Sequence, residues 1–400
     1  MKQKLTLSPD TFLWRKDTVG LLYESKLGIM FHFNITGSIE KLCLAFEDYD
    51  NLYSASFDTD SLDKETLSFI EEVITRGFGI LSSYDSLNIS LPPKLNIQYD
   101  IKRLEHVPDR EIGEFVLEYL STLTIYVGGK CCDKQYFKQV IYPVCSDERL
   151  DMETIIIFLD KVWTPSLQRI NLIVSDVNNQ EYIQIEPFLK YKEHIVFYFL
   201  YTNLDETNMP YILAKAGYLI RFICEYPNDK QVALDIAKSM KEIQQMLLPI
   251  GYDLIVRNNY EYQSWNELVD KLQLKDYSII PIYDDNSEFF DCNVFLSETD
   301  IKQIRISRRE VFAHQAINIE AFGNLTIMPD GQIYSDVTAP SLGSIDDSIY
   351  EIIIRELQEN YAWRKIRDSE TCKNCIYQWL CPSPSSYERV AGKETVCTFK

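Results

Sequence analysis

The stretch CKNCIYQWLCP, residues 372–382, places three cysteines within ten positions, and a fourth, Cys397, follows near the end of the chain. The N-terminus has no long apolar segment of the kind that directs secretion, so we expect a cytoplasmic protein. In a reducing cytoplasm, clustered cysteines bind metals or perform redox chemistry more often than they form structural disulfides. The sequence therefore predicts that Cys372, Cys375, Cys381 and Cys397 bind a metal.

The spacing of the four cysteines leaves two metal groups open. Four thiolates can hold either tetrahedral zinc or a 4Fe-4S cluster. Zinc ribbons use two C-x2-C pairs and this chain has one, while a proline follows Cys381, as it follows a ligand cysteine in ferredoxin-type loops. The pattern favours an iron–sulfur cluster, with zinc as the alternative.

The middle of the chain alternates between two patterns. Six near-continuous apolar runs are typical of parallel strands covered on both faces, at 122–128, 169–175, 194–201, 218–225, 252–257 and 277–284. Helical patterns lie between most of them, at 151–163, 181–191, 230–247 and 264–274. Repeated strand–helix units predict an α/β fold. Six units form a partial barrel or an open sheet, because an eight-stranded barrel needs more chain.

The two ends of the chain have other patterns. Residues 11–17, 19–25 and 28–34 predict three antiparallel strands, followed by helices that begin near Thr36 and Asp63. This order is typical of a small winged-helix-like module. After the middle region, NLTIMPDGQIYSD (324–336) predicts a hairpin with Asp330-Gly331 at its turn, and a helix is expected over 346–366.

The charge balance limits the choice of partners. The formal net charge is −20, which repels nucleic-acid phosphates. It favours a basic peptide partner, although acidity alone is more often a feature of solubility. No run of about 18 apolar residues is present, so we expect no membrane span.

The C-terminal residues resemble a known domain. The PDG hairpin, the SLGSI turn at 341–345, the helix and C-x2-C-x5-C together look like the SPASM domain of radical-SAM peptide maturases. The resemblance implies that Cys372, Cys375, Cys381 and Cys397 hold one auxiliary 4Fe-4S cluster. Ser335 or Asp336, together with Ser385, stand where that family has cysteines for a second cluster, so one cluster is expected rather than two.

The resemblance does not extend to the S-adenosylmethionine (SAM) site of radical-SAM enzymes. Their C-x3-C-x2-C motif follows the first strand, where this chain has only Cys131 and Cys132. From either cysteine, the later two positions of the motif hold Gln135 and Lys138, or Tyr136 and Gln139. The family's Gly-Gly-Glu motif is missing from INLIVSDVNN (170–179). The chain is thus similar to pseudo-radical-SAM proteins, which implies no SAM at the barrel and no catalysis of its own.

The N-terminal module is similar to the PqqD-like recognition element of peptide-modifying systems. That resemblance implies that the leader of a precursor peptide pairs with the edge of the third strand and packs on the last helix. The residues implied are Ile29, Met30, Phe31, His32, Phe33, Phe69 and Val73. The alternative is that these side chains simply fill a small core.

The sequence thus predicts three parts: a winged-helix-like peptide recognition module (1–92), a partial (β/α)6 barrel (93–318) and a SPASM-like iron–sulfur domain (319–400). The expected function is a non-catalytic accessory role in the maturation of a ribosomally made peptide, with the precursor and a radical-SAM maturase as partners. The alternatives are an enzyme or electron-transfer component that uses the C-terminal cluster, and a zinc-stapled peptide-binding protein.

Overall fold

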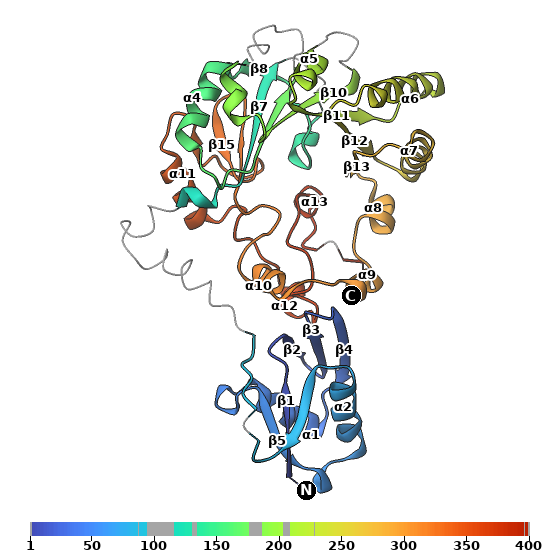
Figure 1. Cartoon of the computed structure of the whole chain (residues 1–400), viewed down its shortest axis with the longest axis vertical. Helices are drawn as coiled ribbons and strands as arrows, with labels where there is room; N and C mark the ends of the chain where they lie inside the picture. Colours follow the sequence, from blue (N-terminus) through green and yellow to red (C-terminus); the bar gives the residue numbers. More distant parts are fainter. Residues whose placement is uncertain are drawn as a thin grey trace.

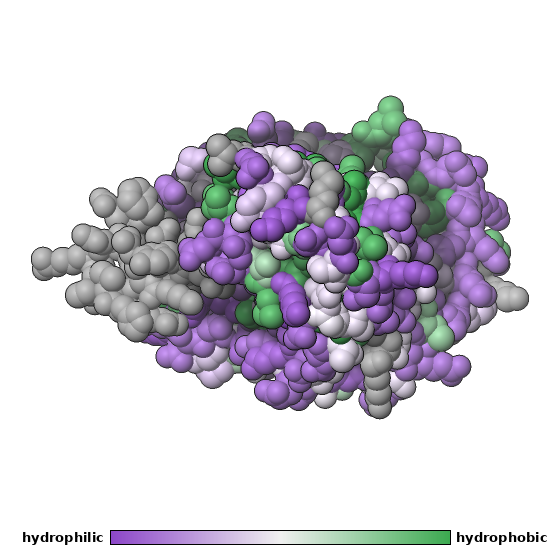
Figure 2. Space-filling view, turned by 90° about the horizontal axis from the view of Figure 1, so that it is seen from below, coloured by the Kyte–Doolittle hydropathy of each residue, from purple (hydrophilic) through white to green (hydrophobic). Residues whose placement is uncertain are grey.

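A computed structural model of the chain describes residues 2–86, 88–93, 116–129, 134–175, 186–202, 209–227, 229–395 and 397–398. Figure 1 shows the N-terminal module at one end of the molecule and a large sheet with its helices at the other. Helices α9, α10 and α12 lie between them. Seen from the end formed by the N-terminal module, the surface is mostly hydrophilic, with small hydrophobic areas (Figure 2).

The N-terminal module contains two three-stranded antiparallel sheets. The first consists of the three predicted strands in chain order: β2 (Thr11–Lys16), β3 (Val19–Glu24) and β4 (Ile29–Asn34). The second has the order β5-β1-β6 and was not predicted: β1 (Lys2–Leu7), β5 (Ser54–Asp58) and β6 (Gly79–Ser83). These strands pair across the module, with Leu5 opposite both Ala55 and Leu81, so local patterns do not reveal them.

Two helices complete the module where the sequence placed them: α1 (Gly37–Glu47) after Thr36 and α2 (Lys64–Thr75) after Asp63. The Asp63 carboxylate caps α2 by accepting a hydrogen bond from the Thr66 amide at 2.7 Å. The helices cover a core of buried side chains from both sheets, which includes Leu5, Leu22, Phe46, Phe69 and Val73. Short 3-10 turns, η1 (Tyr49–Asn51) and η2 (Thr59–Ser61), flank β5.

The large sheet outside the N-terminal module confirms the α/β class. Its order is β13-β12-β11-β10-β9-β7-β14-β15-β16, and the six predicted strands lie side by side in chain order, each parallel to its neighbour. They are β7 (Thr122–Gly129), β9 (Arg169–Val174), β10 (Ile195–Leu200), β11 (Leu219–Glu225), β12 (Ile250–Val256) and β13 (Tyr277–Pro281). Strand β8 (Ser146–Arg149) pairs antiparallel with β7.

The predicted C-terminal hairpin joins this same sheet. Strands β14 (Asn324–Ile327) and β15 (Gln332–Tyr334) form it, and β14 lies parallel to β7, so residues distant in sequence extend the sheet beyond its first strand. Strand β16 (Gly343–Ser344) pairs with β15.

Most of the predicted helices are present. Those of the middle region are α4 (Met152–Val162), α6 (Lys230–Gln245) and α7 (Asn259–Leu272). Helix α5 (Met209–Lys215) was not predicted, and 3-10 turns lie before β7, η3 (Val116–Tyr119), and after it, η4 (Tyr136–Lys138). The prediction over 181–191 is wrong in its described part, where η6 (Glu186–Tyr191) is a 3-10 helix; residues 181–185 lie outside the described residues. Further along are α8 (Ser287–Asn293), α9 (Glu298–Gln303), α10 (Arg308–Ala316), α11 (Ile349–Glu359), α12 (Glu370–Lys373) and α13 (Ser386–Val390).

The predicted helix over 346–366 ends early, at Glu359. Asn360 adopts a left-handed conformation with φ of 56°, which ends α11. The fully buried Glu356 carboxylate then accepts hydrogen bonds from the amides of Ala362 at 2.8 Å and Trp363 at 2.7 Å, and from the Ser335 hydroxyl. A buried charge thereby fixes the turn that leads the chain back toward the cysteines.

Replacing Glu356 with glutamine tests this turn. An amide offers one acceptor oxygen in place of two, so some of these buried donors lose their partner and we expect the free energy of unfolding to fall by about 1–3 kcal/mol. The matched control is Glu359→Gln at the exposed end of the same helix, where we expect a change within about 0.5 kcal/mol. Chemical denaturation measures both, and equal effects of the two substitutions would show that Glu356 does not fix the turn.

Candidate functional site

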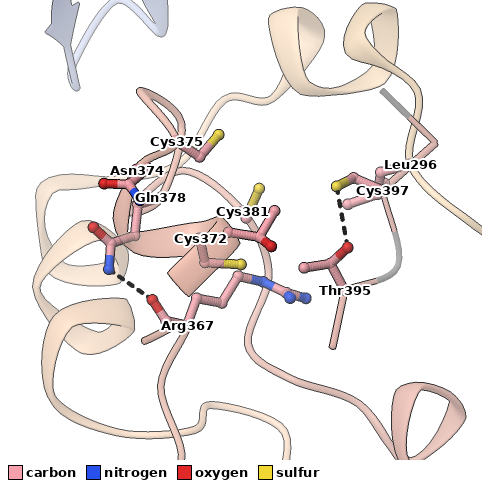
Figure 3. Close-up of a pocket in the computed structure, with 10 residues that line it drawn as sticks. Leu296, Arg367, Cys372, Asn374, Cys375, Gln378, Cys381, Thr395 and Cys397 are labelled. Carbon is pink, nitrogen blue, oxygen red and sulfur yellow. Dashed lines mark hydrogen bonds between the residues drawn. The ribbon is translucent and has the colours of Figure 1, made fainter. Parts of the chain in front are cut away.

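The four predicted cysteines line one cavity. Its volume is about 170 Å³, and Cys372, Cys375, Cys381 and Cys397 all contribute to its wall, together with Arg367, Gln378 and Thr395. Three of the cysteines come from the segment around α12, whereas Cys397 lies on the facing side (Figure 3). The structure therefore brings together the residues that the spacing selected, including the late cysteine.

Hydrogen bonds to the backbone hold the cysteine segment in place. The Ser369 hydroxyl caps α12 by accepting from the Cys372 amide at 3.3 Å. The side chain of Gln378 donates to the carbonyl of Arg367 at 2.6 Å, and a ring nitrogen of His314 lies 3.0 Å from the carbonyl of Trp379. These contacts fix the spacer between Cys375 and Cys381.

Arg367 is the only cationic side chain in the wall of the cavity as the described residues define it. Its guanidinium is buried and forms an ion pair with Glu388 at 2.7 Å. It also donates to the carbonyls of Pro382 and Ser383, directly after Cys381. A fixed positive charge beside four sulfurs stabilises a group that carries negative charge.

The four thiols can act as donors to either of the two metal groups that the spacing leaves open. A zinc ion needs its sulfur ligands about 2.3 Å from one point. Within the described ranges, no three or more His, Cys, Asp or Glu side chains form an arrangement that holds an ion, although all four thiols surround the cavity. Burial raises the pKa of the Cys375 thiol, and that of Cys381 to about 12, so metal binding must release protons from both.

The positions implied for a second cluster are occupied by polar contacts. Asp336 forms an ion pair with Arg389 of α13 at 2.7 Å, and the Ser335 hydroxyl donates to Glu356. Ser385 directly precedes α13, and its buried hydroxyl has no hydrogen-bond partner in the described part of the chain. Asp336 thus connects the hairpin to α13, and Ser335 connects it to α11, without a cysteine.

The residues implied for peptide binding fall into two groups. Phe33, Phe69 and Val73 are 8%, 4% and 0% exposed and belong to the core of the N-terminal module, as the alternative reading expects. Ile29 and Phe31 are partly buried against the same core. In the described ranges β4 pairs with β3 alone, which leaves one edge of β4 open to another strand.

The face of β4 that points away from the core of the N-terminal module contacts the cysteine segment. Met30 packs in a cluster with Phe12, Tyr23, Tyr377 and Leu380, and Cys375 and Cys381 lie at the margin of that cluster. The ring of His32 stands edge-on to the ring of Tyr377, with centroids 5.3 Å apart. The N-terminal sheet is therefore packed directly against the site that holds the four thiols.

The hydroxyl of Tyr23 strengthens this contact. It donates to the carbonyl of Ile306 at 2.6 Å and accepts from the amide of the same residue at 2.7 Å. Tyr23 lies in β3 and Ile306 lies just before α10, so the bonds join the N-terminal sheet to the helices around the cysteines.

The remaining cysteines differ from one another. Buried free thiols are the expectation for all isolated cysteines, and Cys43 and Cys224 are indeed buried. Cys145 and Cys292 are exposed, so that expectation is wrong for them, because each lies in a connection or a helix end rather than under the core. Cys131 and Cys132 lie outside the described residues.

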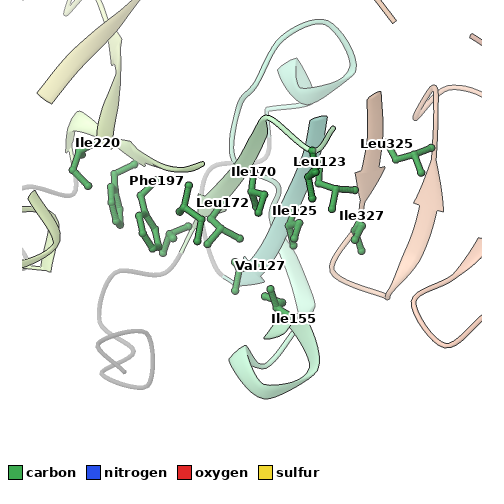
Figure 4. Close-up of a cluster of buried hydrophobic side chains, with 14 of the residues drawn as sticks. Leu123, Ile125, Val127, Ile155, Ile170, Leu172, Phe197, Ile220, Leu325 and Ile327 are labelled. Atoms are coloured by element: carbon green, nitrogen blue, oxygen red, sulfur yellow. The ribbon is translucent and has the colours of Figure 1, made fainter. Parts of the chain in front are cut away.

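The two faces of the parallel sheet are covered differently. One face carries apolar side chains that pack against helices such as α4, with Leu123, Ile125 and Ile155 in contact across the layers (Figure 4). On the other face, Tyr126 and Tyr198 pack against Tyr142 and Val144 from the segment after β7. That segment, residues 134–146, covers part of the face that the helices leave free, and a cavity of about 520 Å³ remains there, lined by residues that include Arg169, Tyr198 and Arg221.

A charged network lies at the carboxyl ends of β11 and β12. Glu225 accepts from Lys134 at 2.6 Å and from Arg257 at 3.1 Å, and it also accepts from the Tyr142 hydroxyl. Burial alone would raise the pKa of Glu225, but these donors hold that pKa below its ordinary value. Sequence reasoning missed this network, because its members come from three distant segments and no spacing links them.

Comparisons with known proteins were informative only at the level of structure. The sequence matches no family model and no curated protein. The crystal structure of Streptococcus suis SuiB bound to precursor peptide SuiA is similar over 99% of both chains, with 11% identity and a TM-score of 0.50. The crystal structure of SuiB bound to S-adenosylmethionine is similar over 99% of both chains, with 11% identity and a TM-score of 0.46. The crystal structure of SuiB alone is similar over 98% of this chain and 100% of the SuiB chain, with 10% identity and a TM-score of 0.47.

The likeness to the SuiB–SuiA structure shows the fold. It extends over 99% of both chains, and it agrees with the expected α/β fold with a large, mostly parallel sheet. In the described part of the chain, no helix has the length and apolar character needed to span a bilayer.

Substituting Cys381 with alanine tests the contact between the cysteine segment and the N-terminal sheet. Because the Cys381 side chain lies beside the cluster that contains Tyr23, we expect faster amide hydrogen exchange both in residues 369–382 and in β3. Cys292→Ala is the matched control, since its side chain is exposed. Faster exchange in residues 369–382 with no change in β3 would contradict the coupling.

Proposed function

We propose that this protein is a non-catalytic accessory protein in the maturation of a ribosomally made peptide. It binds the leader of the precursor through its N-terminal module and acts beside a separate radical-SAM maturase. One observation carries the proposal: the open edge of β4 lies beside α2, within a chain whose fold matches that of SuiB bound to its precursor peptide.

The open edge suits an extended peptide. A six-residue strand with one unpaired side presents backbone N–H and C=O groups that another strand can satisfy. Phe31 and Phe33 stack near Phe69 of α2, with ring centroids 6.0 Å and 4.7 Å apart. Because Phe33 and Phe69 are buried, they support the docking strand from behind, and the peptide contacts Ile29, Phe31 and the backbone.

The lack of catalysis is supported by the sequence and by the packing of the sheet. The three spaced cysteines and the Gly-Gly-Glu motif that radical-SAM enzymes use for SAM are absent from the sequence. Residues 134–146 contribute Tyr136, Tyr142 and Val144 to the packing on the face free of helices. Lys134 and Arg257 pair with Glu225 at the carboxyl ends of the strands, where α/β folds place their ligands.

One 4Fe-4S cluster is the proposed occupant of the cysteine cavity, with Cys372, Cys375, Cys381 and Cys397 as its ligands. Bound by four thiolates, such a cluster can order the surrounding chain and exchange electrons, but it has no free iron for SAM. In their described part, residues 360–398 contain the short helices α12 and α13, and a cluster bound by the four cysteines would cross-link this segment.

SAM binding by isothermal calorimetry tests the non-catalytic reading. On protein purified without oxygen, we expect no saturable binding, which means a dissociation constant weaker than about 1 mM. SuiB, which has been crystallised with SAM, serves as the positive control under the same conditions. Saturable micromolar binding to this chain would overturn the claim that it lacks a SAM site.

A further inference from the structure

The open edge of β4 lies beside a basic groove. The groove has a volume of about 440 Å³ and is lined by Gly28, Ile29, Met30, His32, Arg76, Lys302 and Arg305. None of these lining residues is acidic, although the chain as a whole has a formal net charge of −20. The local charge beside the docking strand is therefore opposite to the charge of the molecule.

The three cations reach the groove from three different elements. Arg76 caps the C-terminus of α2, and its guanidinium lies 5.0 Å from the centre of the Phe31 ring. Lys302 belongs to α9, and Arg305 follows that helix. The stem of Arg305 covers the turn before β4, where a Cβ added at Gly28 would lie 2.9 Å from its Cγ.

Neighbouring carboxylates neutralise only part of this charge. Arg76 pairs with Glu72, and Lys302 pairs with Glu298 at 2.9 Å, each within its own helix. Arg305 is exposed and has no ion pair with any carboxylate in the described part of the chain. At least one full positive charge is thus available at the edge of β4.

The ring of His32 is also part of the groove wall. Burial lowers the pKa of His32, so the ring is neutral at pH 7 and the charge of the groove comes from Arg76, Lys302 and Arg305.

We propose that the peptide bound at β4 is acidic: it carries aspartate or glutamate side chains that bind in this groove. The proposal rests on the proposed function, since it specifies the chemistry of the peptide that the N-terminal module binds. Charges separated by more than a Debye length, about 10 Å at 0.1 M salt, are largely screened, so the groove outweighs the distant acidic surface. A basic peptide, which the net charge alone favours, would meet cations here.

The geometry also sets the pattern of the bound segment. A strand added to β4 alternates its side chains between the two faces of the sheet, as β4 itself does. One face is apolar, with Phe31 against α2, and the other carries His32 and faces Lys302 and Arg305. The expected segment therefore spans about six residues and alternates apolar and acidic side chains, with a carboxylate near the start of β4.

Selection from a random peptide library tests this inference. We would display random 12-residue peptides, select them on the immobilised full-length protein, and sequence the binders. We expect enrichment of Asp and Glu at alternating positions. The double variant Lys302→Glu/Arg305→Glu should lose these binders, with affinities for a selected peptide about tenfold to a hundredfold weaker by fluorescence anisotropy.

The control changes the same charge elsewhere. Lys238→Glu/Lys241→Glu alters two exposed lysines of α6, far from the groove, and should retain the wild-type affinity. Binders without acidic residues, or binders equally weakened by both double variants, would overturn the acidic-groove inference while leaving peptide binding intact. No enrichment of any peptide over a blank surface would instead contradict the proposed function itself.

Discussion

The buried ion pair between Arg367 and Glu388 organises the part of the molecule on which the account depends. In their described part, residues 360–398 contain short helices and one isolated bridge, between Leu296 and Cys397, so regular backbone hydrogen bonding contributes little to their shape. Arg367 instead connects α13 to the carbonyls after Cys381 and projects into the cysteine cavity. A buried charge of this kind is stable only when every partner is in place, and removing one partner typically costs about 3–5 kcal/mol. The position of the four thiols therefore follows from a polar framework that encloses them.

The N-terminal module depends on the same region. The sheet β2-β3-β4 has two faces: one covers the core with α2, and the other packs on the cysteine segment through Tyr23, Met30 and His32. Strand β4 thus lies between the proposed peptide site and the proposed cluster. A change in the order of the cysteine segment would alter the support of the strand that binds the peptide. Such coupling would give the proposed cluster a structural role in the proposed recognition of the peptide.

The sequence predicted those parts of the fold that local patterns encode. All six parallel strands were found because each is a near-continuous apolar run, although the edge strand β13 is only partly buried, and the hairpin was found from Asp330-Gly331. Strands β1, β5 and β6 were missed, because they become strands only by pairing across the module. The helix after the hairpin was predicted to be longer than it is, because no local pattern shows that Glu356 accepts hydrogen bonds from the amides beyond it. The four thiols were grouped correctly by spacing, but the groove of Arg76, Lys302 and Arg305 is formed by residues too distant in sequence to be grouped.

The most direct test of the central claim is the iron, acid-labile sulfide and zinc content of the chain after purification without oxygen. The measurement is made on the wild type, on Cys381→Ala and on the exposed-site control Cys292→Ala. The account predicts about four irons and four sulfides per chain in the wild type and the control, and their loss in Cys381→Ala. About one zinc per chain without sulfide would instead indicate a structural zinc site. Iron that remains bound in Cys381→Ala would show that the four cysteines do not form the metal site.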